Sequence, residues 1–129
     1  MLSSFYAGLL ALLMVWLSLQ VIKLRRAKKV RLGDGGEPEL QAAIRAQGNA
    51  AEYIPISLIL LILLEFNHAP VELLHIAGIA LLMGRILHAK ALLTDNLDYR
   101  KLGMQLTLYT IIGFAVTNIG YALYAIGFK

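Results

Sequence analysis

The sequence has no cysteine, few prolines and few charged residues. The absence of cysteine among its 129 residues excludes disulfide frameworks, thiolate zinc sites and cysteine nucleophiles. Charged residues make up 16% of the chain and hydrophobic residues 59%, whereas a soluble domain averages about 25% and about 45–50%. The length allows one domain. This composition excludes an ordinary soluble enzyme and indicates an integral membrane protein.

Long apolar stretches occur in four parts of the chain. Residues 5–22 carry no charge, and with their flanks they reach the roughly 20 residues that a membrane helix needs. Nothing basic precedes them and no small-residue cleavage site follows, so we do not expect a signal peptide. We predict spans at about residues 4–24, 40–66, 71–93 and 102–126, with a polar connector at residues 94–101 before the last. The predicted fold is an all-α, up-down four-helix membrane bundle, in one domain covering residues 1–129.

Basic residues are distributed unevenly between the two sides of such a bundle. Eleven of the twelve Lys and Arg residues lie on or near the connectors after the first and third spans, and Lys129 falls on the other side. The positive-inside rule therefore predicts cytoplasmic connectors and termini on the outside. Because topology accounts for the net charge of +4, we expect no nucleic-acid partner. Glycines at 33, 35 and 36 lack the Lys-Ser/Thr ending of a phosphate loop, which favours a simple connector.

The second span carries polar residues that lipid tolerates poorly. Arg45, Asn49 and Glu52 stand at i, i+4 and i+7, within about 60° of one another on a helix, and Gln41 extends this stripe. A charge near the centre of a span costs roughly 2.5–3.5 kcal/mol on insertion scales, so the stripe must face protein or a hydrated cavity. Two interpretations are open. One is a buried ion-pair cluster that holds helices together; the other is a site for a zwitterionic ligand, since arginine binds carboxylates and glutamate accepts from an ammonium.

Five further residues bear on the packing around this stripe. Tyr53 lies about 80° from its centre, so we expect it to reach a neighbouring helix. On the third span Arg85 and His88 share a face. Arg85 either joins a polar site or extends toward the cytoplasmic surface, and His88 is either a packing residue or a ligand-binding one. Gly113 and Gly120 in the last span are expected to allow close helix approach.

The string Arg45-Ala46-Gln47-Gly48-Asn49-Ala50-Ala51-Glu52-Tyr53-Ile54-Pro55 resembles the second-helix signature of the MAPEG family, membrane-associated proteins of eicosanoid and glutathione metabolism. That signature is Arg, three residues, Asn, two residues, Glu, often an aromatic residue, then Pro. The length, the four spans, the basic first connector and the third-span segment Gly84-Arg85-Ile86-Leu87-His88 also fit, so the resemblance covers nearly the whole chain. Within the family the chain is most similar to a short bacterial inner-membrane member, which implies an inner-membrane location.

The resemblance implies a homotrimer that binds glutathione as cosubstrate between adjacent subunits, near the cytoplasmic face. The residues that match glutathione-lining positions are Arg45, Asn49, Glu52, Tyr53 and His88, joined by Arg26 or Arg25 from the cytoplasmic end of the first helix. It also implies glutathione transferase or peroxidase activity on a hydrophobic small molecule or lipid. In that chemistry Arg100 stabilises the thiolate, with Lys101 as the alternative.

Two departures from the family pattern leave catalysis open. One turn after His88 the family enzymes commonly have tyrosine, where this chain has Leu92. The thiolate-stabilising arginine begins the fourth helix in those enzymes, and here only Arg100 or Lys101 is near enough in sequence. One alternative is therefore a non-catalytic member of the same fold. Another is a small proton-coupled transporter, although such proteins usually carry their glutamate in the first span, which is uncharged here.

Overall fold

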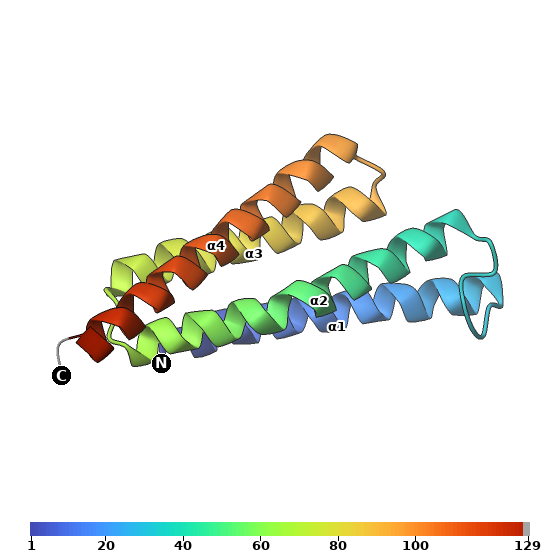
Figure 1. Cartoon of the computed structure of the whole chain (residues 1–129). Helices are drawn as coiled ribbons and strands as arrows, with labels where there is room; N and C mark the ends of the chain where they lie inside the picture. The colour runs from blue at the N-terminus through green and yellow to red at the C-terminus, as the bar shows by residue number, and fades with distance from the viewer. Residues whose placement is uncertain (128–129) are drawn as a thin grey trace.

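The computed structural model describes residues 1–127, which form a bundle of four helices (Figure 1). The helices are α1 (Leu2–Lys28), α2 (Pro38–Phe66), α3 (Val71–Leu93) and α4 (Leu97–Gly127). The described residues contain no strand, and each predicted span lies within one helix. The prediction of an all-α four-helix bundle is confirmed. Lys129, which the topology prediction uses, lies outside the described residues.

All four helices are long and apolar enough to cross a membrane. Their outer surfaces carry large apolar side chains that are more than half exposed, among them Leu12, Ile59, Ile76 and Val116. Apolar surface on this scale is unfavourable in water but matches the hydrocarbon interior of a bilayer. The exposed surface therefore agrees with the membrane class that the composition predicts.

Helices α1 and α2 form one antiparallel hairpin, and α3 and α4 form another (Figure 1). Helix α3 packs against the other three helices, whereas no residues of α1 and α4 contact each other within the described chain. The N-terminus and the end of α4 lie at one end of the bundle, and the α1–α2 and α3–α4 connectors lie at the other. The up-down arrangement is thus confirmed. Its core consists largely of buried leucines, including Leu10, Leu17, Leu61, Leu64 and Leu81.

Local backbone chemistry sets the boundaries of the first connector. Lys29 ends α1 in the left-handed conformation, with φ of 57°. Gly33 and Gly36 also have positive φ, 67° and 74°, which glycine adopts without a steric penalty. Pro38 then begins α2, where the N–H group that proline lacks has no partner within the helix anyway. These residues turn the chain back so that α2 runs antiparallel to α1.

The connector between α3 and α4 is shorter than predicted. We expected a polar connector at residues 94–101, but α4 already begins at Leu97. Asn96 caps this helix, because its Oδ1 accepts the backbone N–H of Tyr99 at 3.1 Å, and Asp98 places a negative charge in the first turn. The polar residues that led us to predict a loop are of types that are also favoured at the N-terminus of a helix. The two basic residues that follow are consequently held on α4.

Glycines allow α3 and α4 to pack with their backbones in close contact. A Cβ added at Gly103 of α4 would lie 2.6 Å from the backbone nitrogen of His88 on α3. A Cβ added at Gly84 of α3 would lie 2.8 Å from Oγ1 of Thr107 on α4. No larger residue fits at either position unless the helices move apart. Small residues that permit such approach are typical of helix interfaces in membranes.

The close approach predicted for Gly113 and Gly120 is wrong within this chain. A Cβ added at either residue would meet nothing within 4 Å, because this part of α4 lies on the surface of the subunit. The third close contact is instead at Gly78 of α3, where an added Cβ would collide with the ring of Tyr6 on α1. Sequence alone identified the residue type but not the side of the helix that faces a neighbour.

Polar contacts also join the helices at the end of the bundle opposite the connectors. The Glu65 carboxylate, near the end of α2, accepts the backbone N–H groups of Leu2 and Ser3, the latter at 2.9 Å. The hydroxyl of buried Tyr6 lies 2.8 Å from Nδ1 of His75 on α3. These contacts fix α1 against both α2 and α3. Most of the predicted site residues lie at the opposite end of the bundle, near the connectors.

Candidate functional site

Arg85 of α3 is the centre of a buried polar cluster. Only 2% of its surface is exposed. Its Nε donates to Oγ1 of Thr107 on α4 at 3.0 Å, and its Nη1 donates to Oδ1 of Asn49 on α2 at 2.7 Å. The Tyr53 ring lies 5.5 Å from the guanidinium carbon, a cation–π contact. The expectation that Tyr53 reaches a neighbouring helix is confirmed, and the alternative that Arg85 extends toward the cytoplasmic surface is wrong.

The partners of Arg85 are all neutral. They are the Thr107 hydroxyl, the side-chain amide and backbone carbonyl of Asn49, the Met104 sulfur and the Tyr53 ring. No carboxylate among the described residues forms an ion pair with the guanidinium. A buried cation that lacks a counter-charge is held by hydrogen bonds alone and keeps a positive potential around it. Arg85 therefore ties α2, α3 and α4 together and also favours an anion in its surroundings.

The polar stripe on α2 is divided between the inside and the outside of the subunit. Asn49 is buried and faces Arg85. Arg45 and Glu52 instead form an ion pair with each other, with Nη1 and Oε1 3.7 Å apart, and their side chains are 60% and 56% exposed. The interpretation of the whole stripe as a buried ion-pair cluster is therefore wrong for this subunit, because its two charges lie on the surface.

A cavity adjoins the buried cluster on the side of α4. This inner cavity has a volume of about 380 Å³, and its lining includes Asn49, His88, Arg100, Lys101 and Met104. His88 is only 4% exposed, and its ring makes no hydrogen bond with any described residue. A buried imidazole that lines a cavity in this way is available to a molecule that enters. Four predicted site residues thus come together here from three helices.

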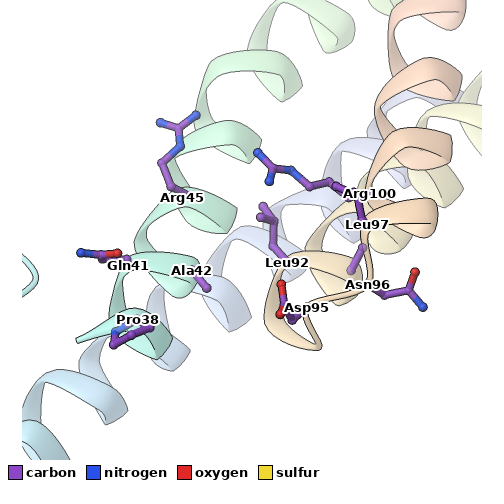
Figure 2. Close-up of a pocket in the computed structure, with 10 residues that line it drawn as sticks. Pro38, Gln41, Ala42, Arg45, Leu92, Asp95, Asn96, Leu97 and Arg100 are labelled. Atoms are coloured by element: carbon purple, nitrogen blue, oxygen red, sulfur yellow. The ribbon is translucent and has the colours of Figure 1, made fainter. Parts of the chain in front are cut away.

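A second cavity lies between α2 and the α3–α4 connector (Figure 2). This connector cavity has a volume of about 240 Å³ and is lined by Arg45 and Gln41 of α2, Leu92 of α3, Asp95 and Arg100, among others. Figure 2 shows Arg100 extending from α4 across the cavity toward α2. Leu92 forms part of the wall, so its position lies within the candidate site although it contributes no polar group.

Arg100 is shared by the two cavities, which makes them parts of one site. With Arg45 on one side and Lys101 on the other, the site carries three cations. Asp95 in the wall of the connector cavity and Glu52, which pairs with Arg45, supply two carboxylates. Such a set suits a ligand with more than one carboxylate and a single ammonium group. The asparagine amide and the imidazole add neutral hydrogen-bonding groups at the buried end.

Arg26 is the predicted site residue that lies apart from the other predicted site residues within one subunit. It lies near the end of α1 and lines a separate cavity with Arg25, Lys29 and Arg31. Apart from Arg25, its alternative in the sequence analysis, none of the other predicted site residues lines that cavity.

Sequence reasoning missed Thr107 and Met104 of α4. Thr107 is fully buried, donates to the carbonyl of Gly103 at 2.9 Å and accepts from Arg85. Met104 lines the inner cavity. Both stand in a long uncharged stretch in which threonine and methionine carry no signal. Only the packing of α4 on α3, which the paired glycines allow, identifies them.

Comparison with known proteins gives the family of this chain. The sequence profile of the MAPEG family matches residues 3–120. The chain is 41% identical over 121 residues to Inner membrane protein YecN of Escherichia coli (strain K12), with 94% of this chain and 92% of that protein covered. The protein of the same name from E. coli O6:H1 (strain CFT073) matches equally. Together with the four apolar helices, this likeness supports a multi-pass inner-membrane location. The chain belongs to the MAPEG family.

Proposed function

We propose that this protein binds glutathione at the connector end of the bundle and either adds the glutathione thiolate to hydrophobic electrophiles, as a transferase, or uses glutathione to reduce hydrophobic peroxides, as a peroxidase. The observation that carries the proposal is the convergence of Arg45, Arg100 and Lys101 with Asn49 and His88 on two cavities that share Arg100. Glutathione has two carboxylates and one ammonium. In the site, cations outnumber carboxylates, whereas in glutathione carboxylates outnumber the ammonium. The charge of the site is therefore complementary to that of the ligand.

The charged groups divide between binding and chemistry. Arg45 and Glu52 pair with each other on α2, and the glutamyl end of glutathione, which carries both a carboxylate and the ammonium, would meet one cation and one anion there. Arg100 extends into the cavity that opens toward this pair and also lines the inner one. The thiolate is the nucleophile, but a free thiol has a pKa of about 8.5 and is mostly protonated at neutral pH. A guanidinium near the thiol favours the thiolate by stabilising its negative charge. Arg100 is therefore the residue proposed to stabilise the thiolate, with Lys101 as its neighbour.

A homotrimer is the proposed assembly, and the α2 surface supports it. Arg45 and Glu52 are more than half exposed on a helix that crosses the membrane. Charges that face lipid within a span are costly, so this face requires a protein or aqueous neighbour. A second subunit that covers it would enclose the ligand and bring its own α1 terminus, with Arg26, to the site. The hydrophobic electrophile would then enter laterally from the bilayer.

Binding without turnover is the second candidate function. It is favoured by Leu92, which lines the connector cavity where the resemblance leads us to expect tyrosine. Proton-coupled transport has less support, because Glu52 is paired with Arg45 and Glu65 is engaged with the first turn of α1. Neither carboxylate of α2 in these positions is free to exchange protons with a passing substrate.

The test is calorimetric titration of reduced glutathione into the detergent-purified protein. We expect saturable binding, weakened about tenfold or more by Arg45→Ala or Glu52→Ala, since a hydrogen bond to a charged group contributes about 1.5–3 kcal/mol. Arg100→Ala should lower turnover of a chloronitrobenzene electrophile more than it lowers binding. Lys23→Ala, an exposed site on α1 that lines neither cavity, is the control.

Three outcomes are informative. Binding that is lost in the α2 variants but retained in the control supports the site. Binding without turnover of any electrophile or peroxide supports the second candidate. No binding at millimolar glutathione by a folded protein would refute the proposed function.

A further inference from the structure

The end of α1 and the connector after it enclose a cavity distinct from the candidate site. Its volume is about 650 Å³, and it is lined by Ile22, Arg25, Arg26, Lys29, Val30 and Arg31. Its lining residues lie at the connector end of the α1–α2 hairpin, the part of the hairpin that extends away from α3 and α4 in Figure 1. Four of the six lining residues are cationic and the other two are apolar. We call it the basic cavity.

The connector that forms the basic cavity is held in a defined conformation. Arg25 donates through Nη1 to the carbonyl of Gly33 at 2.7 Å, which folds the connector back on α1. Lys28, on a different side of the helix end, pairs with Glu37 at 3.3 Å. The Val30 side chain lies so close to Gly35 that an added Cβ would lie 2.7 Å from it. The cavity is therefore built by contacts within the connector.

None of the four cations in the basic cavity has a counter-charge among the described residues, and Arg25 donates instead to a backbone carbonyl. Arg26, Lys29 and Arg31 form no ion pair with any described residue, whereas nearby Lys28 does. All three are exposed at the end of a membrane-spanning helix. Uncompensated cations at this height meet the phosphate layer of a bilayer, where clusters of Lys and Arg bind anionic lipids.

An exposed apolar stripe on α1 leads directly to these cations. Leu12, Val15, Leu19 and Ile22 fall with Arg26 within about 80° on the helix. The four apolar residues of this stripe are exposed, and none of α1 is covered by α4. Ile22 belongs to both the stripe and the wall of the cavity. An acyl chain and a phosphate of one molecule thus find continuous complementary surfaces.

We propose that the basic cavity binds the phosphate group of an anionic phospholipid whose acyl chains lie along the α1 stripe. The apolar stripe and the unpaired cations together favour a lipid over a free phosphate, which would use only the cations. Within one subunit none of the residues of this site lines the inner or the connector cavity, and Arg26 is the one residue that the proposed function also places at glutathione.

The experiment uses the single tryptophan of the chain, Trp16. Trp16 lies ten residues before Arg26, or about 15 Å along the helix, which is about the depth of one leaflet of hydrocarbon. Phosphatidylglycerol or phosphatidylcholine with brominated acyl chains is titrated at low mole fraction into micelles of the full-length protein. We expect brominated phosphatidylglycerol to quench Trp16 fluorescence at a lower mole fraction than brominated phosphatidylcholine.

The test variant is Lys29→Gln/Arg31→Gln, and Lys23→Gln/Lys90→Gln is the matched control. Both remove two positive charges near the same membrane surface, but Lys23 and Lys90 lie outside the basic cavity. Arg26 is left unchanged because the family resemblance places it at glutathione. We expect the test variant to lose about fivefold or more of the preference for the anionic lipid relative to the control.

Several results would overturn the proposal. One is equal quenching by the two lipids in the unsubstituted protein. Another is the same loss of preference in the control as in the test variant, which would indicate general surface attraction. Displacement of the brominated lipid by millimolar inorganic phosphate would indicate a free-phosphate site instead. Absence of quenching by either lipid would show that a second copy covers the stripe.

Discussion

Replacing Gly103 with alanine should separate α3 from α4 and thereby disturb the candidate site. The added Cβ would lie 2.6 Å from the backbone nitrogen of His88 and 2.8 Å from the carbonyl oxygen of Gly84. Both are backbone atoms, so rotation of a side chain cannot relieve the contact. Ordinary contact begins at 3.4 Å, so α4 must retreat from the His88 nitrogen by about 0.8 Å.

The energetic consequence follows from this displacement. Overpacking of a well-packed interior typically costs about 1–3 kcal/mol. The hydrogen bond between Arg85 and Thr107, now 3.0 Å, would lengthen as α4 moves, and such bonds in membranes contribute about 0.6 kcal/mol on average. Alanine recovers about 1 kcal/mol in helix propensity over glycine. The expected loss in free energy of unfolding is therefore about 0.5–2.5 kcal/mol.

The measurement is unfolding of the detergent-purified protein by increasing mole fraction of dodecyl sulfate, followed by far-ultraviolet circular dichroism. Gly113→Ala is the matched control, because the same substitution on the same helix meets no atom within 4 Å. It should be neutral or more stable by up to about 1 kcal/mol. Equal unfolding of the two alanine variants would refute the packing argument. A loss of stability in Gly103→Ala with unchanged glutathione affinity would show that the interface does not position the site.

Three further predictions concern contacts away from this interface. Gly78→Ala should destabilise the protein by about 1–3 kcal/mol in the same assay, and Tyr6→Ala in that background, which removes the ring that the added Cβ would meet, should reveal coupling between the two positions. Simple additivity would contradict a direct contact. Asn96→Ala should lower the free energy of unfolding by about 0.5–2 kcal/mol. It should also speed hydrogen exchange at the backbone N–H of Tyr99, which Asn96 caps, with exchange at the start of α2 as the internal control. Glu65→Gln should speed exchange in the first turn of α1 alone, and uniform acceleration along α1 would argue against local capping.

Several features of the fold follow from local patterns in the sequence and could be predicted. Each of the four spans contains an apolar stretch long enough to cross a membrane, which indicates membrane helices. Basic residues are concentrated on two connectors, which predicts the side of the membrane on which these connectors lie. Tyr53 reaches across to α3 as its angular offset from the stripe predicts. The start of α4 was misplaced because polar residues near Asn96 favour both loops and helix caps. Amphipathic and capping rules act within one helix, so they predict elements better than they predict neighbours.

Composition and local pattern are enough to predict the membrane class, the helices and the residue types of the site. The burial of Arg85 against Asn49 and Thr107, and the pairing of Arg45 with Glu52 on the outside, follow from how the helices pack on one another. Which face of a membrane helix meets protein depends on close approach between backbones, and apolar residues that face lipid look the same in sequence as those in the core. The glycines at 84 and 103 set that approach through a match between two distant segments, which no local pattern reveals.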